Sequence, residues 1–514
     1  MARSESDDGL EVVRRLRDAM STGDTETVAA VASEFTWQLV TRHYDLLLEV
    51  LDGLPLSVLE RYENLKLVHP VTPTLMRAQF QYPEAGARVE RNALDGRQRD
   101  ESLATLLVSR RLHGNVKLSL EAAERLSERL REGFRQITAT ESSLAAQFRF
   151  QIGYTYLLDG QTGTALQSFS AARQLAELDP TDHSQRDAVS RSAVTHAFRG
   201  SLWQAQRDLD RSRALPDGAM PFGAFISTAE RIAEALIDLE RMSPDLDTRM
   251  TELDSYDSVD ELWPFIALIR ARYELTRRHP MAALDAISLA FETHRWQPDT
   301  MAADIRASCL VHAFLALGEV AAARDICEEA GTRLPLTRIA HVRVLIFEGN
   351  FAEATRECRS ISGAQKGSVA VRTEAMLLLA WVTYQMEKEL ELSDARSVAD
   401  LALTGDFRRL FSTLPKDLID AVCEALPDAE AERVRTVLAD IEFAVPLPQR
   451  PKLSPSEMRV LEELVDSTKT AEIAERLFVT QNTVKTQLAS IYRKLGVRNR
   501  ADAITLATRL SLFG

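Results

Sequence analysis

The sequence has few cysteines and no long apolar run, and each shortage narrows what the chain can be. Its four cysteines have no paired spacing, which favours buried, reduced thiols over a disulfide framework. Cys309 and His312 lie three residues apart and are too few to hold a metal ion. The longest apolar run, residues 376–382, is far shorter than the roughly 18 residues of a membrane span, and the N-terminus lacks the apolar core of a signal peptide. We therefore expect a cytoplasmic chain with no metal and no membrane partner.

The sequence also lacks the patterns of nucleotide-dependent switches and of enzymes. No phosphate-binding loop of the type Gly-x-x-x-x-Gly-Lys-Ser/Thr occurs, and the nearest segment, residues 363–368, has the wrong spacing. The alternation of strands and helices that a receiver domain needs is missing. The scattered histidines have no carboxylate or nucleophile at a suggestive spacing. We expect no cofactor, ATP included, and no enzymatic activity.

Four short helices are predicted in the C-terminal segment, residues 453–514. Ser454, Pro455 and Glu457 encode a helix start, with a hydroxyl N-cap, a proline in the first turn and a carboxylate that reaches back. A second short helix follows, and Thr480 can cap a third. The spacing of the middle two helices is that of a helix-turn-helix.

The third of these helices has two different sides. Its apolar residues recur at steps of three and four, the period of a helix buried on one side: Val484, Leu488, Ile491 and Leu495. The opposite side carries short or cationic side chains: Asn482, Lys485, Thr486, Ala489 and Arg493. Such a side fits a helix that enters a major groove about 12 Å wide and reaches base edges. The segment therefore predicts binding to double-stranded DNA.

This segment resembles the DNA-binding domain of the LuxR family of bacterial transcription regulators. The resemblance covers about 60 of the 514 residues and rests on a dense set of positions: Leu453, Glu457, Val460, Leu461, Glu472, Ile473, Ala474, Leu477, Val479, Thr483, Val484, Lys485, Ile491, Lys494, Leu495, Gly496, Val497, Arg500 and Ala503. The chain departs from the family pattern at Ser467, Lys469, Gln487 and Ala489. Because Lys469 replaces the usual serine cap, Thr468 or Thr470 would have to cap the second helix.

The resemblance implies a set of DNA-binding residues: Thr480, Asn482, Thr483, Lys485, Thr486, Gln487, Arg493 and Lys494. We expect Lys485 to reach a base, and Thr486 either to contact a thymine methyl group or to remain solvated. We expect Arg493 and Lys494 to hold phosphates. Arg498 and Arg500 are further candidates for phosphate contact.

The resemblance also implies a homodimer on DNA. The predicted contacts come from the last helix: Ala503, Leu506, Ala507 and Leu510. Two-fold pairing would make the promoter site an inverted repeat with half-sites about one helical turn apart. Packing of this helix against the rest of the chain is the alternative. RNA polymerase is a further partner that the resemblance allows.

Charge is divided unevenly along the chain. Residues 451–514 contain four Lys and six Arg against seven acidic residues, a net charge of about +3. Because the whole chain carries −14, the first 450 residues carry about −17. This body cannot hold DNA nonspecifically, and it should repel the duplex.

The body is predicted to be helical, with a TPR-like repeat. Residues 148–180 resemble a tetratricopeptide (TPR) unit through six residues: Gly153, Tyr156, Gly160, Ala165, Phe169 and Ala172. A glycine five residues before an alanine recurs: Gly160 and Ala165, Gly200 and Ala205, Gly318 and Ala323, Gly349 and Ala354. One such pair arises by coincidence in unrelated helix hairpins, but four favour a helical solenoid.

Residues 44–70 resemble, through Leu47, Leu51, Leu54, Pro55, Leu59 and Pro70, the helical segment that follows the ATPase module in MalT-type members of the LuxR family. We therefore predict an all-α chain, a TPR-like solenoid followed by a four-helix LuxR-type helix-turn-helix domain. Its expected parts are an N-terminal helical region (1–85), a TPR-like domain (86–443), a proline-rich linker (444–452) and the DNA-binding domain (453–514). The chain looks like a MalT-type regulator without the ATPase module.

The predicted function is sequence-specific regulation of transcription. The TPR-like domain would sense a peptide, a protein or a small-molecule effector. The alternative is a TPR-type interaction scaffold whose C-terminal domain no longer reads DNA.

Overall fold

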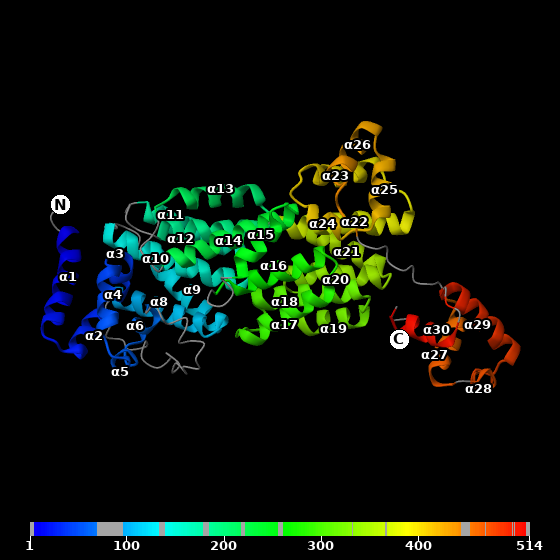
Figure 1. The fold of residues 1–514 in the computed structure, drawn as a ribbon, viewed down its shortest axis with the longest axis horizontal. Coiled ribbons are helices and arrows are strands. Elements are labelled where there is room, and N and C mark those ends of the chain that lie inside the picture. The colour runs from blue at the N-terminus through cyan, green and yellow to red at the C-terminus, as the bar shows by residue number, and fades with distance from the viewer. Residues whose placement is uncertain are drawn as a thin grey trace. The chain divides into compact units, whose positions relative to one another are not determined.

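The computed structural model describes residues 5–68, 96–132, 139–177, 184–216, 222–254, 261–331, 333–364, 367–443, 453–467, 469–495, 497 and 499–509. Over these ranges the chain is all-α, as predicted, and contains no strand (Figure 1). No helix in them combines the length and apolarity needed to cross a bilayer. In the same ranges, no cluster of His, Cys, Asp and Glu is suited to a metal ion.

The chain divides into two compact units. The first comprises Met1–Arg272, Ala286–Arg306 and Lys366–Ala370, and the second Tyr273–Asp285, Ala307–Gln365 and Val371–Gly514. The predicted linker, 444–452, lies outside the described residues, as does the predicted boundary near residue 85. Those boundaries remain predictions.

The first unit begins with short helices that share one core: α1 (Glu5–Ser21), α2 (Thr25–Glu34), α3 (Thr36–Arg42), α4 (Tyr44–Gly53), α5 (Leu56–Leu59) and α6 (Glu63–Val68). Leu47 and Leu51, from the segment predicted to resemble MalT-type regulators, are buried in it. Trp37 joins this group to the helices that follow. Its indole N–H donates to Thr105 Oγ1 at 3.1 Å, and its ring meets Phe148 edge-on at 5.6 Å.

The helices that follow form successive pairs along the chain. The earlier ones are α8 (Gly96–Leu112), α9 (Val116–Glu132), α10 (Ala139–Asp159), α11 (Thr162–Ala176), α12 (Ser184–Phe198), α13 (Leu202–Ala214), α14 (Phe222–Arg241), α15 (Leu246–Asp254), α16 (Trp263–Thr276) and α17 (Pro280–Thr293). The later ones are α18 (Met301–Leu317), α19 (Val320–Ala330), α20 (Pro335–Phe347), α21 (Phe351–Ser362), α22 (Val369–Glu387), α23 (Leu392–Leu403), α24 (Arg408–Ser412), α25 (Lys416–Ala425) and α26 (Asp428–Val437).

The glycine of each predicted glycine–alanine pair lies in the turn between two helices. At Gly160, where φ is +98°, the glycine N–H donates to the Leu157 carbonyl and the Gln161 N–H to the Tyr156 carbonyl. These two bonds satisfy the last carbonyls of α10, and they need a residue with positive φ. The same conformation occurs at the other three glycines, and the partner alanines are fully buried: Ala165, Ala205, Ala323 and Ala354. Assignment of these pairs to the TPR family remains a prediction.

Helices α10 and α12 are covered on every side. None of their described side chains is exposed, so they offer no free face to an effector. Several charged groups beside and within them are paired, because an unpaired buried charge is costly. Arg111 donates to Glu261 at 2.6 Å and to the Gln151 amide oxygen at 2.7 Å, and Asp187 pairs with Arg191 at 3.3 Å.

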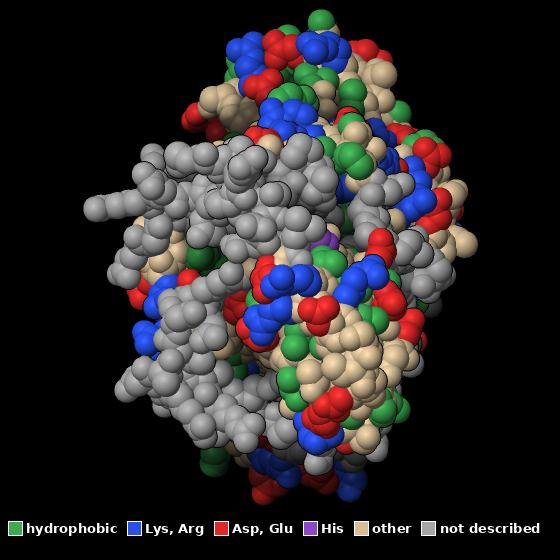
Figure 2. All heavy atoms as spheres, turned by 90° about the vertical axis from the view of Figure 1, so that its left-hand side faces the viewer, with side chains coloured by type: hydrophobic (Ala, Val, Ile, Leu, Met, Phe, Trp, Pro, Cys, Tyr) green, Lys and Arg blue, Asp and Glu red, His purple; other side chains and the backbone are tan. Residues whose placement is uncertain are grey.

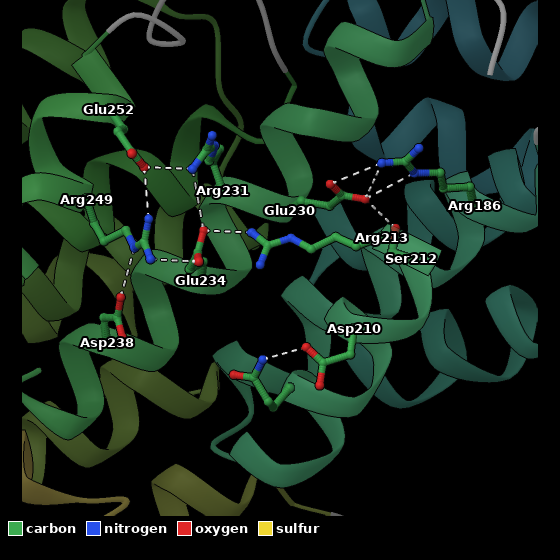
Figure 3. A network of polar contacts seen from close by, with 11 residues as sticks. Arg186, Asp210, Ser212, Arg213, Glu230, Arg231, Glu234, Asp238, Arg249 and Glu252 are labelled. Atoms are coloured by element: carbon green, nitrogen blue, oxygen red, sulfur yellow. Dashed lines mark hydrogen bonds and ion pairs between the residues drawn. The ribbon is translucent and has the colours of Figure 1, made fainter. Parts of the chain in front are cut away.

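A network of ion pairs joins α12, α13, α14 and α15 (Figure 3). Glu230 accepts from Arg186 at 3.2 Å and from the Ser212 hydroxyl at 2.6 Å. One helical turn later, Glu234 contacts Arg213 and Arg249, each at 2.8 Å. These contacts link four consecutive helices and pair their charges within the unit. On the face shown in Figure 2, the coloured basic and acidic side chains are interspersed.

In the second unit a buried triad joins three helices. Arg343 on α20 and Glu374 on α22 form an ion pair at 2.7 Å, and His312 on α18 lies 3.7 Å from the same carboxylate. Burial acts to raise the pKa of Glu374, but Arg343 and His312 outweigh it and hold that pKa well below its usual range. All four cysteines are buried, and burial raises the pKa of Cys327 and of Cys358 to about 12. These two thiols are therefore packing residues at neutral pH.

Candidate nucleic-acid interface

The described part of the C-terminal segment contains four helices with a core of their own. They are α27 (Pro455–Asp466), α28 (Thr470–Arg476), α29 (Gln481–Leu495) and α30 (Arg500–Arg509). Every helix contributes to the core: Val460, Leu461, Leu464, Ile473, Ala474, Val484, Leu488, Ile491, Leu495, Ala503 and Ala507. The apolar side of α29 therefore faces inward, as its period predicts.

The start of α27 has the predicted capping box. The Ser454 hydroxyl accepts from the Glu457 N–H at 3.2 Å, and the Glu457 carboxylate accepts from the Ser454 N–H at 2.6 Å. The start of α28 differs from the expectation. Its N-cap is Lys469, which makes no side-chain capping bond, and Thr470 is already the first helical residue. Instead Ser467, where the family usually has glycine, donates to Glu472 at 2.7 Å in the first turn of α28.

The turn between α28 and α29 fixes the start of the candidate recognition helix. Thr480 caps α29 as predicted, because its hydroxyl accepts from the Thr483 N–H at 3.2 Å. Phe478 ends α28 with φ at +56°, and its side chain is 96% exposed. No role for Phe478 is predicted from the sequence. The sequence did contain one signal for the unusual backbone of Phe478. A helix commonly ends on a residue with positive φ, and no glycine follows Leu477 to adopt it.

Four of the predicted DNA-binding residues lie on the exposed side of α29. Asn482, Lys485, Thr486 and Arg493 are exposed, while Thr483 and Gln487 are half-buried. The Thr486 hydroxyl donates to the Asn482 carbonyl at 2.9 Å, so the polar group of Thr486 is already used within the helix. What Thr486 offers outward is mainly its methyl group. This side of α29 therefore presents two flexible cations, Lys485 and Arg493, among short side chains.

Lys494 has a partner inside the domain. Its ammonium donates to Glu457 at 2.6 Å, and Glu457 also accepts from the Ser490 hydroxyl at 2.8 Å. The hydrogen bonds from Lys494, from the Ser454 backbone and from Ser490 lower the pKa of Glu457 to about 2. Arg500 likewise donates to the Leu464 carbonyl. Neither side chain is a free surface cation, although both are candidates for phosphate contact on sequence grounds.

The last helix, α30, packs on its own domain. Ala503 and Ala507, both predicted as dimer contacts, are fully buried in the core described above. Their methyl groups fill the space beside α27 and α29. The dimer contact through α30 remains a prediction. The side chain of Leu506 and all of Leu510 lie outside the described residues.

Comparison with known proteins places this segment in a family. The pattern of "Bacterial regulatory proteins, luxR family" matches residues 451–507. The spore germination protein GerE of Bacillus subtilis is 36% identical over 61 residues, which cover 12% of this chain and 82% of GerE. The uncharacterized transcriptional regulatory protein YxjL of the same organism is 31% identical over 113 residues, 20% of this chain and 49% of YxjL. The CsgBAC operon transcriptional regulatory protein of Escherichia coli is 38% identical over 55 residues, 11% of this chain and 26% of that protein. The chain thus spans half or less of the length of YxjL and of the CsgBAC regulator.

Proposed function

Because this chain belongs to the luxR family of bacterial regulatory proteins, we propose that it is a sequence-specific, DNA-binding regulator of transcription. One observation supports this most: the side of α29 opposite the core is exposed and carries short or cationic side chains from Asn482 to Arg493. A helix with these properties can enter the major groove without steric conflict. The proposal concerns the whole chain, of which the family pattern covers only the C-terminal part.

In the proposed complex, several residues on and just before α29 have distinct roles. Lys485 donates to the O6 or N7 of a guanine, which are acceptors in the major groove. The Thr486 methyl group packs on a thymine methyl. Arg493 holds a backbone phosphate, and Thr480 and Thr483 lie at the N-terminal end of α29, where the helix dipole favours an anion. These contacts are few, so two chains on an inverted repeat would be needed for tight and selective binding.

We propose that the body, the first 450 residues, controls the C-terminal DNA-binding domain. A peptide, a protein or a small molecule would act as the effector, and RNA polymerase would be the partner at the promoter. Since α10 and α12 have no exposed side chain among their described residues, the effector would contact other parts of the body. It must bind more tightly to one of two states of the chain, because a ligand with equal affinity for both shifts neither. The proposed regulator acts in the cytoplasm and is not an enzyme.

The proposal is tested by selecting fragmented genomic DNA with the full-length protein. We expect recovery of one inverted-repeat motif, and loss of that motif with Lys485→Ala. A scaffold whose C-terminal domain no longer reads DNA would recover fragments without a shared motif. That result would overturn the proposal.

A further inference from the structure

Basic side chains tie the other helices of the C-terminal domain to α27. Lys494, near the end of α29, donates to Glu457 at 2.6 Å. Arg476, at the end of α28, contacts Glu463 at 3.0 Å. Arg500, at the start of α30, donates to a backbone carbonyl near the end of α27. Each of the other three helices thus contacts α27 through a different basic side chain.

Among the two carboxylates, Glu457 is much the more enclosed. The side chain of Glu457 is 8% exposed, whereas that of Glu463 is 27% exposed. Besides Lys494, Glu457 accepts from the Ser454 N–H and the Ser490 hydroxyl, so both of its oxygens are occupied. An enclosed carboxylate that loses its cation keeps the cost of leaving water without the compensating attraction. The domain therefore uses the ammonium of Lys494, whose side chain is partly exposed, to pair this enclosed carboxylate.

Arg493 differs from its neighbour. Both residues are exposed, but among the described residues an ion pair engages Lys494 and none engages Arg493. Arg493 also lies on the same side of α29 as Lys485 and Thr486. A charge in this setting is available to a phosphate at no cost to the fold.

We infer that Lys494 is a positioning residue, which sets the angle between α27 and the recognition helix, and that of this adjacent pair Arg493 is the one that holds a phosphate. This inference rests on the proposed DNA-binding function and assigns roles within that site. Lys494 would act through Ser490 and Glu457, by holding the C-terminal end of α29 against the start of α27. Its contribution to DNA binding would then be geometric rather than ionic.

Salt dependence separates the two roles. Each phosphate that a cation binds releases a counterion, so a variant that binds one phosphate fewer has a slope of log affinity against log salt that is lower by about 0.9. The full-length wild type, Arg493→Gln and Lys494→Gln are compared by fluorescence anisotropy. Each is titrated between roughly 50 and 200 mM KCl on a duplex with the recovered inverted repeat and on a shuffled duplex.

We expect Arg493→Gln to give a shallower slope on both duplexes, by about 0.9 for each phosphate that the variant no longer binds. We expect Lys494→Gln to keep the wild-type slope on both while it weakens binding to the recovered duplex. A slope for Lys494→Gln as shallow as that for Arg493→Gln would overturn the inference and leave the proposed function intact. A wild type with neither salt dependence nor preference would refute the proposed function instead.

Two further variants keep the test decisive if Lys494→Gln does not fold. Glu457→Gln retains the charge of Lys494 but removes its anionic partner. We expect it to weaken binding to the recovered duplex at unchanged slope, whereas a lysine that holds a phosphate would be released and would bind more tightly. Lys494→Arg can keep the ion pair and should restore wild-type binding. Tighter binding by Glu457→Gln would contradict the positioning role.

Discussion

At the scale of single residues, recognition depends on a few side chains on one side of α29. Lys485 is exposed, and its four-carbon stem allows its ammonium to reach past the short side chains around it. Thr486 has its hydroxyl bonded within the helix and offers a methyl group. Specificity in this account is therefore carried by one donor and one small apolar contact per chain.

Lys485→Ala should cost roughly 1–3 kcal/mol of binding to the selected sequence, because it removes a hydrogen-bond donor aimed at a base. Competition binding against singly mutated duplexes measures the loss and shows which base pair it concerns. Lys469→Ala is the control, since it removes an exposed lysine from the start of α28 instead of α29. An equal loss on every sequence would show that Lys485 holds a phosphate.

The carboxylate of Glu457 predicts a pH dependence for the C-terminal domain. Its pKa is about 2 in the folded chain against an ordinary value of 4.5. Because the folded-state pKa is lowered, the stabilisation is fully present above about pH 4.5 and is lost as the pH falls toward 2. Amide hydrogen exchange in residues 453–495 of wild type and Glu457→Gln should therefore differ near pH 6 and converge near pH 2. A difference that stays constant over this range would refute the assignment.

Part of this site could be predicted from residues alone. The caps at Ser454 and Thr480 and the inward side of α29 follow from local chemistry and helical period. The pairing of Lys494 with Glu457 does not, because 37 residues separate them and only the packing of α27 against α29 brings them together. For the same reason the burial of Ala503 and Ala507 by neighbouring helices could not be read from the apolar pattern of α30.

At the scale of elements, a residue with positive φ recurs in the turns between paired helices. Glycine adopts this conformation at Gly160 and Gly200, and the glycine pattern marks those turns in the sequence. Met242, Arg278 and Lys388 adopt it between α14 and α15, α16 and α17, and α22 and α23. No glycine marks these turns, so the sequence pattern missed them. Tertiary packing evidently offsets the cost of about 1–2 kcal/mol for a side chain in this region.

Gly200 is the turn at which a side chain should cost most. A Cβ there would lie 2.7 Å from the backbone nitrogen of Ala370, whose N–H donates to the Arg199 carbonyl at 2.8 Å. Gly200→Ala would have to displace that segment in addition to straining φ. Gly23, with φ at +71° and no atom within 4 Å of an added Cβ, is the matched control in the same unit.

We expect Gly200→Ala to lower the midpoint of thermal unfolding clearly more than Gly23→Ala, for which only the backbone strain of about 1–2 kcal/mol applies. Differential scanning calorimetry of the two full-length variants measures both shifts. Equal shifts would mean that the start of α22 does not pack on this turn.

At the scale of the whole molecule, the chain combines an acidic body with a weakly basic C-terminal domain, called the reader below. The body carries about −17 and the segment from residue 451 about +3. This division could be read from composition, and so could the all-α fold. The covering of α10 and α12 could not, because it depends on how several helices on either side of them in sequence pack around them.

The reader should fold without the body, because its core is formed by residues from Val460 to Ala507 alone. Residues 446–514 should give a cooperatively unfolding helical domain by circular dichroism, and this fragment should still bind the selected duplex. It should also bind shuffled DNA more tightly than the full chain at low salt, since the acidic body repels the duplex. A folded fragment without any DNA binding would show that the body supplies the dimer.

The central claim is that α29 places its exposed side in a major groove and reads sequence there. The most direct test is the affinity of the full-length protein for the recovered inverted repeat and for a shuffled duplex, at two salt concentrations. The account predicts a preference for the inverted repeat at both salts and a steep fall in affinity for both duplexes at the higher salt. Equal affinities for the two duplexes, or binding that does not change with salt, would contradict it.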